Sequence, residues 1–129
     1  MSLVKLGGLI AVVIATTTGC ASKRSGQRGW SNADAPSVTV RNDNWLDVVV
    51  YLVRGASRFR MGTVRSTSTE TFRLPSGAHS GGSPLRIMAD PIGASQGYLT
   101  EPVVLGPGQR LELKVASPIN VSSFAVWDR

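Results

Sequence analysis

From Ser37 onward, clusters of Gly, Pro, Asn and Ser divide the sequence into short apolar runs, and no window carries a sustained helical period. Short runs bounded by turn-forming residues are typical of β-strands. The expected strands are Val38–Arg41, Leu46–Arg54, Ser57–Val64, Glu70–Leu74, Leu85–Ala89, Tyr98–Leu105, Arg110–Ala116 and Val121–Trp127. This punctuation predicts one all-β domain over residues 37–129.

Seven or eight short strands in a segment of this length favour a small antiparallel sandwich of two sheets, immunoglobulin-like or transthyretin-like. A small barrel is the competing architecture. The chain has 129 residues and one cysteine, so a disulfide within the chain is impossible. A segment of this size can nevertheless bury a core without cross-links, and we expect an ordinary stability of roughly 5–15 kcal/mol.

The segment Arg110–Ala116 has the cleanest alternation of polar and apolar residues. Alternate residues of a strand point to opposite faces, so Leu111, Leu113 and Val115 are expected to face the core. The preceding segment Gly106–Gln109 is expected to form a tight turn. In it, proline presets φ and glycine supplies a positive φ.

A hairpin is expected at Gly55-Ala56, because glycine at the first position of a two-residue loop suits a type II′ turn. This loop length predicts three inward pairs, namely Leu52 with Phe59, Val50 with Met61, and Val48 with Thr63. A three-residue loop would instead place Arg60 on the inner face, where burial of its charge is costly.

The same register places Val49, Tyr51 and Val53 on the outer face of the hairpin, beside Arg58 and Arg60. We expect Arg60 to lie over the Tyr51 ring in a cation–π contact worth about 0.5–1 kcal/mol. These five residues form a candidate partner surface, because tyrosine and arginine are enriched in binding hot spots. The alternative is that a loop or an edge strand covers the apolar strip.

Residues 1–19 have the build of a secretory signal peptide, with Lys5 in a short n-region and the apolar stretch Leu6–Ala15. That stretch is too short to cross a bilayer, which takes about 20 residues. Export of the chain from the cytoplasm is therefore expected.

The junction Gly19-Cys20 resembles the lipobox of bacterial lipoproteins, although Thr17 stands where that family usually has leucine. The resemblance implies cleavage before Cys20, attachment of diacylglycerol to the Cys20 thiol, and anchoring of the acylated chain in a lipid bilayer. Ala21 and Ser22 resemble the pattern that sorts lipoproteins to the outer membrane in bacteria with two membranes. Plain cleavage after Ala21 is the alternative.

Residues 20–36 read as the lipidated cysteine followed by a flexible tether, because this stretch is polar and has little apolar surface to bury. As a flexible chain the tether would span roughly 20–24 Å. Lys23, Arg24 and Arg28 would then lie near lipid headgroups. Trp30 would either enter the membrane interface or fold back onto the domain.

The sequence offers little catalytic or metal-binding chemistry. His79, the single histidine, lies in a glycine-rich loop where no second group is expected to hold it, as a catalytic triad requires. Neither a zinc site nor a cofactor is expected, because no second histidine or further cysteine accompanies it. Asn42, Asp43, Asn44 and Asp47 resemble a calcium loop in composition but lack its spacing, and they favour a turn. Trp45 and Trp127 are expected to be core or rim aromatics.

The net charge of +6 is spread along the chain, which favours solubility over sequence-specific nucleic-acid binding. We therefore expect a noncatalytic module of the cell envelope that binds a protein or a glycan. In a bacterium with two membranes it would face the periplasm from the outer membrane. The alternative is an assembly component of a secretion system, because the layout resembles that of small outer-membrane lipoproteins of type VI systems.

Overall fold

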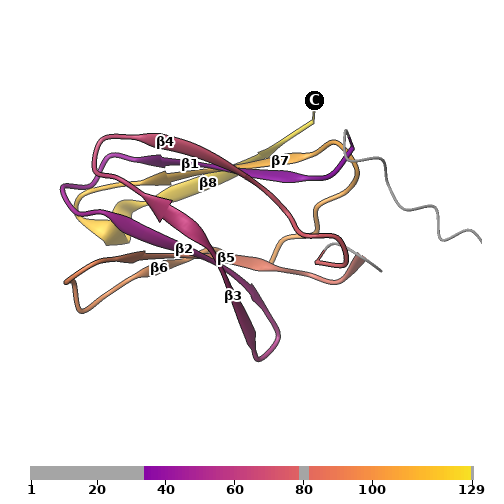
Figure 1. The fold of residues 1–129 in the computed structure, drawn as a ribbon, viewed down its shortest axis with the longest axis horizontal. Coiled ribbons are helices and arrows are strands. Elements are labelled where there is room, and N and C mark those ends of the chain that lie inside the picture. Colours follow the sequence, from indigo (N-terminus) through magenta and orange to yellow (C-terminus); the bar gives the residue numbers. More distant parts are fainter. Residues whose placement is uncertain (1–33, 79–81, 129) are drawn as a thin grey trace, which may run out of the picture.

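The computed structural model describes residues 34–78 and 82–128. Cys20, Trp30, most of the expected tether and His79 lie outside the described residues. The described chain forms two stacked sheets (Figure 1). The strands are β1 (Ser37–Asn42), β2 (Val48–Arg54), β3 (Ser57–Val64), β4 (Thr69–Arg73), β5 (Arg86–Pro91), β6 (Tyr98–Leu99), β7 (Arg110–Val115) and β8 (Ser123–Trp127), with a short 3-10 helix η2 (Ile119–Val121) before the last strand.

One sheet has the strand order β4-β1-β7-β8 and the other the order β3-β2-β5-β6. All neighbouring strands are antiparallel except β1 and β7, which run parallel. The predicted all-β sandwich of two sheets is thus confirmed. Its core is formed by the inward residues of both sheets, including Val38, Leu52, Ile87, Leu111 and Leu113, each at most 1% exposed.

The two ends of the sandwich differ in what they carry, and we name them for use below. The tether end holds the start of β1, the β2–β3 hairpin and the turn 106–109, and there the Gly108 amide donates to the Asp34 carbonyl. The loop end holds the connections 43–47, 65–68, 92–97 and 116–122. In Figure 1 the loop end lies on the left and the start of β1 lies on the right, while the tip of the β2–β3 hairpin points downward.

The turn before β7 has the predicted form. The Gln109 amide donates to the Gly106 carbonyl at 3.2 Å, and Gly108 has a φ of 72°. The alternation in β7 also holds, because Leu111, Leu113 and Val115 are fully buried. Local sequence was sufficient here because both the turn and the alternation are set by neighbouring residues.

The β2–β3 hairpin has the predicted two-residue loop, with Arg54 opposite Ser57 and Leu52 opposite Phe59. The remaining two inward pairs were wrong, because a β-bulge at Met61 shifts the register between Val50 and Tyr51. Val50 pairs with Gly62 instead of Met61, and Val48 pairs with Val64 instead of Thr63.

The bulge is explained by packing against the opposite sheet. A bulge re-aims the side chains that follow it, and here it turns Val64 into the core, where it is fully buried. It also places Gly62 under the Phe72 ring of β4. A Cβ atom on Gly62 would lie 2.6 Å from that ring. The register therefore depends on a residue of the other sheet, which the hairpin sequence does not contain.

The predicted strand Tyr98–Leu105 is much shorter than expected, because only Tyr98–Leu99 forms a ladder with β5. Beyond it, the buried Thr100 hydroxyl accepts a hydrogen bond from the Ile87 amide at 2.9 Å. The chain then touches the sheet again at an isolated bridge between Leu85 and Val103. Pro102 lies between these two contacts and has no N–H to donate, which explains the interruption.

Candidate functional site

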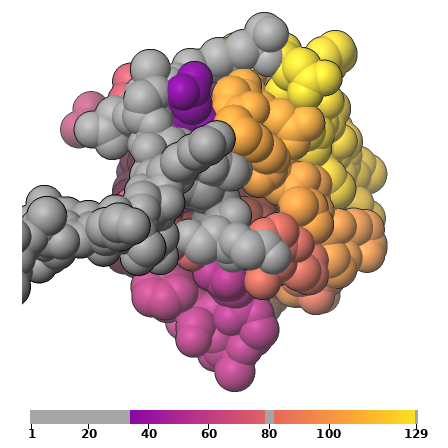
Figure 2. Space-filling model, turned by 90° about the vertical axis from the view of Figure 1, so that its right-hand side faces the viewer, coloured from indigo at the N-terminus to yellow at the C-terminus, as the bar shows by residue number. Residues whose placement is uncertain are grey.

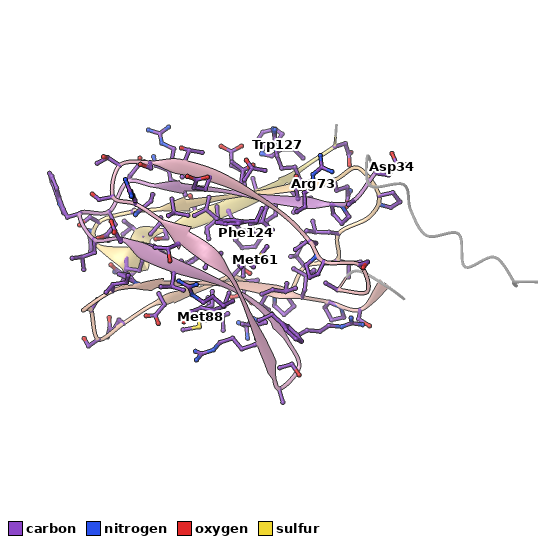
Figure 3. The ribbon with its side chains drawn as sticks, in the orientation of Figure 1. Asp34, Met61, Arg73, Met88, Phe124 and Trp127 are labelled. Carbon is purple, nitrogen blue, oxygen red and sulfur yellow. The ribbon has the colours of Figure 1, made fainter. Side chains whose placement is uncertain are left out.

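The residues of the predicted outward strip share one face, as the sequence indicated. Val49, Tyr51 and Val53 alternate with fully or almost fully buried neighbours along β2 and are each partly exposed. Met88 of β5 lies directly opposite Tyr51 and extends the strip sideways. Figure 3 shows Met88 on the side of its sheet that faces away from the other sheet.

The cation–π contact on this face involves a different arginine from the one expected. The Arg58 guanidinium, rather than that of Arg60, lies 4.5 Å from the centre of the Tyr51 ring. Arg58 is directly opposite Val53, so it reaches Tyr51 along a diagonal of the twisted sheet. Arg60 donates instead to the Thr63 hydroxyl at 2.7 Å, across the bulge.

Arg58 therefore covers part of the apolar strip. One of its terminal nitrogens also lies 4.0 Å from the Met88 sulfur. A third arginine, Arg86, lies opposite Val53 on the other side and donates to the Thr100 carbonyl at 2.8 Å. The predicted partner surface is thus a narrow apolar strip crossed by guanidinium groups, and each of these groups is held by a neutral partner.

A second candidate surface lies at the loop end, where the connection 43–47 presents Trp45. The Trp45 side chain is 82% exposed, so the expectation of a core or rim aromatic was wrong for this residue. Trp127 is also 53% exposed, on the last strand. An exposed tryptophan is costly in water and is therefore a frequent sign of recognition.

The Trp45 loop is shaped by the asparagines that the sequence marked as a turn. The Asn44 amide donates to the Asn42 side-chain oxygen, and the Leu46 amide donates to the Asn44 side-chain oxygen, each at 3.0 Å. Trp45 is the middle residue of the second of these turns, so its side chain projects outward while the Asn44 side chain holds the Leu46 amide. The predicted local turn is confirmed.

Asn42 also ties this loop to both sheets. Its side-chain nitrogen lies 2.9 Å from the Leu46 carbonyl oxygen, 3.2 Å from that of Val64 and 3.0 Å from that of Arg65. Asn42 ends β1 in one sheet, whereas Val64 ends β3 in the other. The fully buried amide thus connects the two sheets at the loop end and holds the base of the Trp45 loop.

A shallow hollow of about 360 Å³ lies beside Trp45. It is lined by Asn44, Trp45, Leu46, Pro91, Ala94, Ser95, Gln96, Ser117 and Ile119. These residues come from the loops 43–47, 92–97 and 116–122, which are far apart in sequence. An aromatic wall with amide and hydroxyl groups around it is the composition of a recognition site for a ligand that is partly polar.

Within residues 34–78 and 82–128, no group of three or more His, Cys, Asp or Glu side chains is placed to hold a metal ion. The described ranges also contain no helix with the length and apolar character that a membrane crossing requires. Asp43, one of the residues that resemble a calcium loop in composition, forms ion pairs with Arg41 at 2.9 Å and with Lys114 at 3.8 Å. Its carboxylate is thus paired with basic side chains.

Sequence reasoning missed the loop-end site because it treated Trp45 as a packing residue. The available signal was its position directly after the turn-forming residues Asn42, Asp43 and Asn44, where a large side chain has no strand face to pack against. The other walls of the hollow could not be assembled from sequence, since their proximity follows from the order of strands in the two sheets.

Comparison with known proteins adds little to this picture. No family model matches the chain, and no curated protein is similar to it. Among solved structures, an NMR structure of a protein from Eubacterium rectale aligns with a TM-score of 0.48 and 10% sequence identity. The alignment covers 77% of this chain and 94% of that one.

Proposed function

We propose that this protein is a lipid-anchored module of the bacterial cell envelope, and that its sandwich binds an envelope protein or glycan through the loop end. The anchor would be diacylglycerol on Cys20, as the lipobox-like junction implies. The module acts by binding rather than by catalysis. The observation that carries the proposal is the position of Trp45 relative to the point where the tether joins the domain.

Asp34 and the start of β1 lie at the tether end, whereas the Trp45 loop follows the far end of that strand. Figure 1 shows the two at opposite ends of the molecule. A protein held to a membrane by its N-terminus would present the loop end away from the bilayer. This places an exposed tryptophan and the adjoining hollow where an envelope partner can reach them.

The anchor is tested by a Cys20→Ser variant. We expect the variant to lose acylation and signal-peptide processing, because the thiol is the acceptor of the diacylglycerol group. Membrane fractionation and mass spectrometry of the N-terminus of the parent and the variant measure this. A parent chain that is unmodified and begins at Ser22 would contradict lipidation, because it would show plain cleavage after Ala21.

The binding surface is tested by a Trp45→Ala variant of the mature chain. Loss of a hot-spot tryptophan typically costs about 2 kcal/mol or more, so we expect retention on isolated envelopes to weaken by about thirtyfold. The control is Val104→Ala, whose side chain is 52% exposed and lies outside the loop end. Both chains should carry Cys20→Ser, so that no acyl group contributes to retention.

Treatment of the envelopes beforehand identifies the partner. If protease abolishes retention the partner is a protein, and if lysozyme does so it is a glycan. Equal retention of the Trp45→Ala variant and its parent would refute the loop end as the binding surface.

A further inference from the structure

Charge is distributed unevenly along the sandwich. The register places Arg54, Arg58, Arg60, Arg73, Arg86 and Arg110 in the half that contains the tether end, together with the carboxylates Asp34, Glu101 and Asp128. The half that contains the loop end carries Arg41, Arg65 and Lys114 against Asp43, Asp47, Glu70 and Asp90, and Glu112 lies near the middle of β7. The tether half is therefore positive, whereas the loop half carries one more acidic than basic side chain.

The β2–β3 hairpin carries arginines on its outer face and one exposed aromatic side chain on its inner face. Phe59 stands between Arg58 and Arg60 in the sequence, and its side chain is 55% exposed. It belongs to the inner face of the hairpin, opposite Leu52. Phe59 is nevertheless accessible, because the tip of the hairpin bends away from the opposite sheet (Figure 1).

The end-on view shows the same feature from the tether end. In Figure 2 the magenta atoms of the β2–β3 segment form a projection at one corner, opposite the yellow atoms of the C-terminal strand. That C-terminal strand carries the half-exposed Trp127, which lies directly opposite Arg110 at the tether end. Two exposed aromatic side chains thus lie at this end of the domain, with arginines near each of them.

We propose that the tether end docks on an anionic phospholipid surface, with Phe59 of the hairpin inserted among the headgroups and Arg58 and Arg60 bound to lipid phosphates. The anionic surface is that of the membrane to which the acyl anchor attaches, so the biological setting rests on the proposed function. Docking itself depends only on residues of the folded domain and can be measured without the anchor.

Three physical arguments favour this partner. Arginines at the surface of an anionic bilayer each strengthen binding by about fivefold, through the surface potential. Aromatic side chains favour the headgroup region of a bilayer, where an apolar ring and water are both within reach. A chain tethered at the same end keeps the hairpin near the bilayer at high effective concentration, so weak individual contacts are sufficient.

The docked orientation also leaves the loop end free. Because the hairpin and the Trp45 loop lie at opposite ends of the sandwich, a domain held at the hairpin would point the Trp45 loop away from the bilayer. The hairpin would thereby convert a flexible attachment into a preferred orientation. A domain that is already oriented loses less rotational entropy when a partner binds at the loop end.

The test uses the whole mature chain, residues 20–129, with Cys20→Ser so that no acyl chain is present. Vesicles of phosphatidylcholine with 30% phosphatidylglycerol are compared with vesicles of phosphatidylcholine alone, and bound protein is measured by cosedimentation. We expect binding to the anionic vesicles that weakens as salt is raised. Phe59→Ser and Arg60→Gln should each weaken that binding by about fivefold.

Two matched controls separate the hairpin from general effects of charge and aromaticity. Trp45→Ser removes an exposed aromatic residue at the loop end, and Arg65→Gln removes an exposed arginine there. Neither should change vesicle binding. The comparison between variants also cancels any contribution of Lys23, Arg24 and Arg28, which all chains retain.

Insertion is measured directly with an environment-sensitive fluorophore. The chain has one cysteine, so Cys20→Ser combined with Phe59→Cys creates a single labelling position. The fluorophore at position 59 should shift to the blue on anionic vesicles, whereas one at position 45 should not. This measurement also holds if Phe59→Ser lowers the stability of the domain.

The proposal is overturned if Phe59→Ser and Arg60→Gln bind anionic vesicles as well as the parent, or if the fluorophore at position 59 does not respond. Equal binding of the parent and Phe59→Ser to dextran sulfate, without a vesicle effect, would identify a soluble polyanion as the partner instead. A failure of lipidation would be detected separately, in the mass of the N-terminus. It would not change the interpretation of the vesicle experiment, because that experiment uses a chain without an acyl group.

Discussion

An Asn42→Ala variant is expected to lose about 3–5 kcal/mol of unfolding free energy, a large part of the total for a domain of this size. The substitution removes a fully buried amide whose nitrogen serves three carbonyl oxygens and whose oxygen accepts from the Asn44 amide. Leaving several buried polar groups without a partner costs about 1–3 kcal/mol for each group. Urea denaturation of the variant and its parent measures the difference.

The matched control is Asn120→Ala, which removes the same side chain from an exposed position in η2. We expect a change within about 0.5 kcal/mol for this variant, as is usual at the surface. Similar losses for the two variants would show that Asn42 does not hold the sheets together as described. A large loss at Asn42 alone would support its role at the base of the Trp45 loop.

A Leu52→Ala variant is expected to cost about 2–5 kcal/mol, whereas Phe59→Ser should cost less than about 1 kcal/mol. The two residues form a cross-strand pair, yet Leu52 is 1% exposed and Phe59 is 55% exposed. Removing the leucine leaves a cavity in the core. Removing the phenylalanine deletes a ring that already lies largely in water.

Thermal melting of both variants measures this pair of effects. From the sequence alone, the larger loss would be expected for Phe59, because it is the larger residue and was placed on the same inner face. If Phe59→Ser unfolds the domain while Leu52→Ala does not, the hairpin packs against the opposite sheet and is not available to a membrane. The same melting curves serve as the folding control for the Phe59→Ser variant used in the vesicle experiment.

The outward strip and the loop end differ in how far each could be predicted from the sequence. The strip was found from sequence because a two-residue loop and strict alternation determine which face each β2 residue occupies. The contacts within the strip were less predictable, because the twist of the sheet places Arg58, and not Arg60, over the Tyr51 ring. Because Arg58 covers the Tyr51 ring, the strip exposes less apolar surface than the sequence predicted.

The loop end had almost no signal in the sequence. Ser95, Gln96 and Ser117 carry no motif, and they lie beside Trp45 only because the loops 92–97 and 116–122 meet the loop 43–47 at one end of the sandwich. Exposure of Trp45 likewise depends on what surrounds it in three dimensions, which composition does not contain. The functional hypotheses therefore combine a sequence-based anchor with a structure-based surface.

The sequence by itself determined the strand content, the two-residue hairpin loop, the turn before β7 and the inward face of that strand. All of these depend on neighbours within a few residues, through turn preferences and the twofold period of a strand. Only the tertiary structure decided the bulge at Met61, the exposure of Phe59 and the position of Asn42 between the sheets. Each of these depends on a residue of another strand, such as Phe72 over Gly62 or Val64 beside Asn42. Contacts between distant segments set these features, and no local pattern encodes which segments will meet.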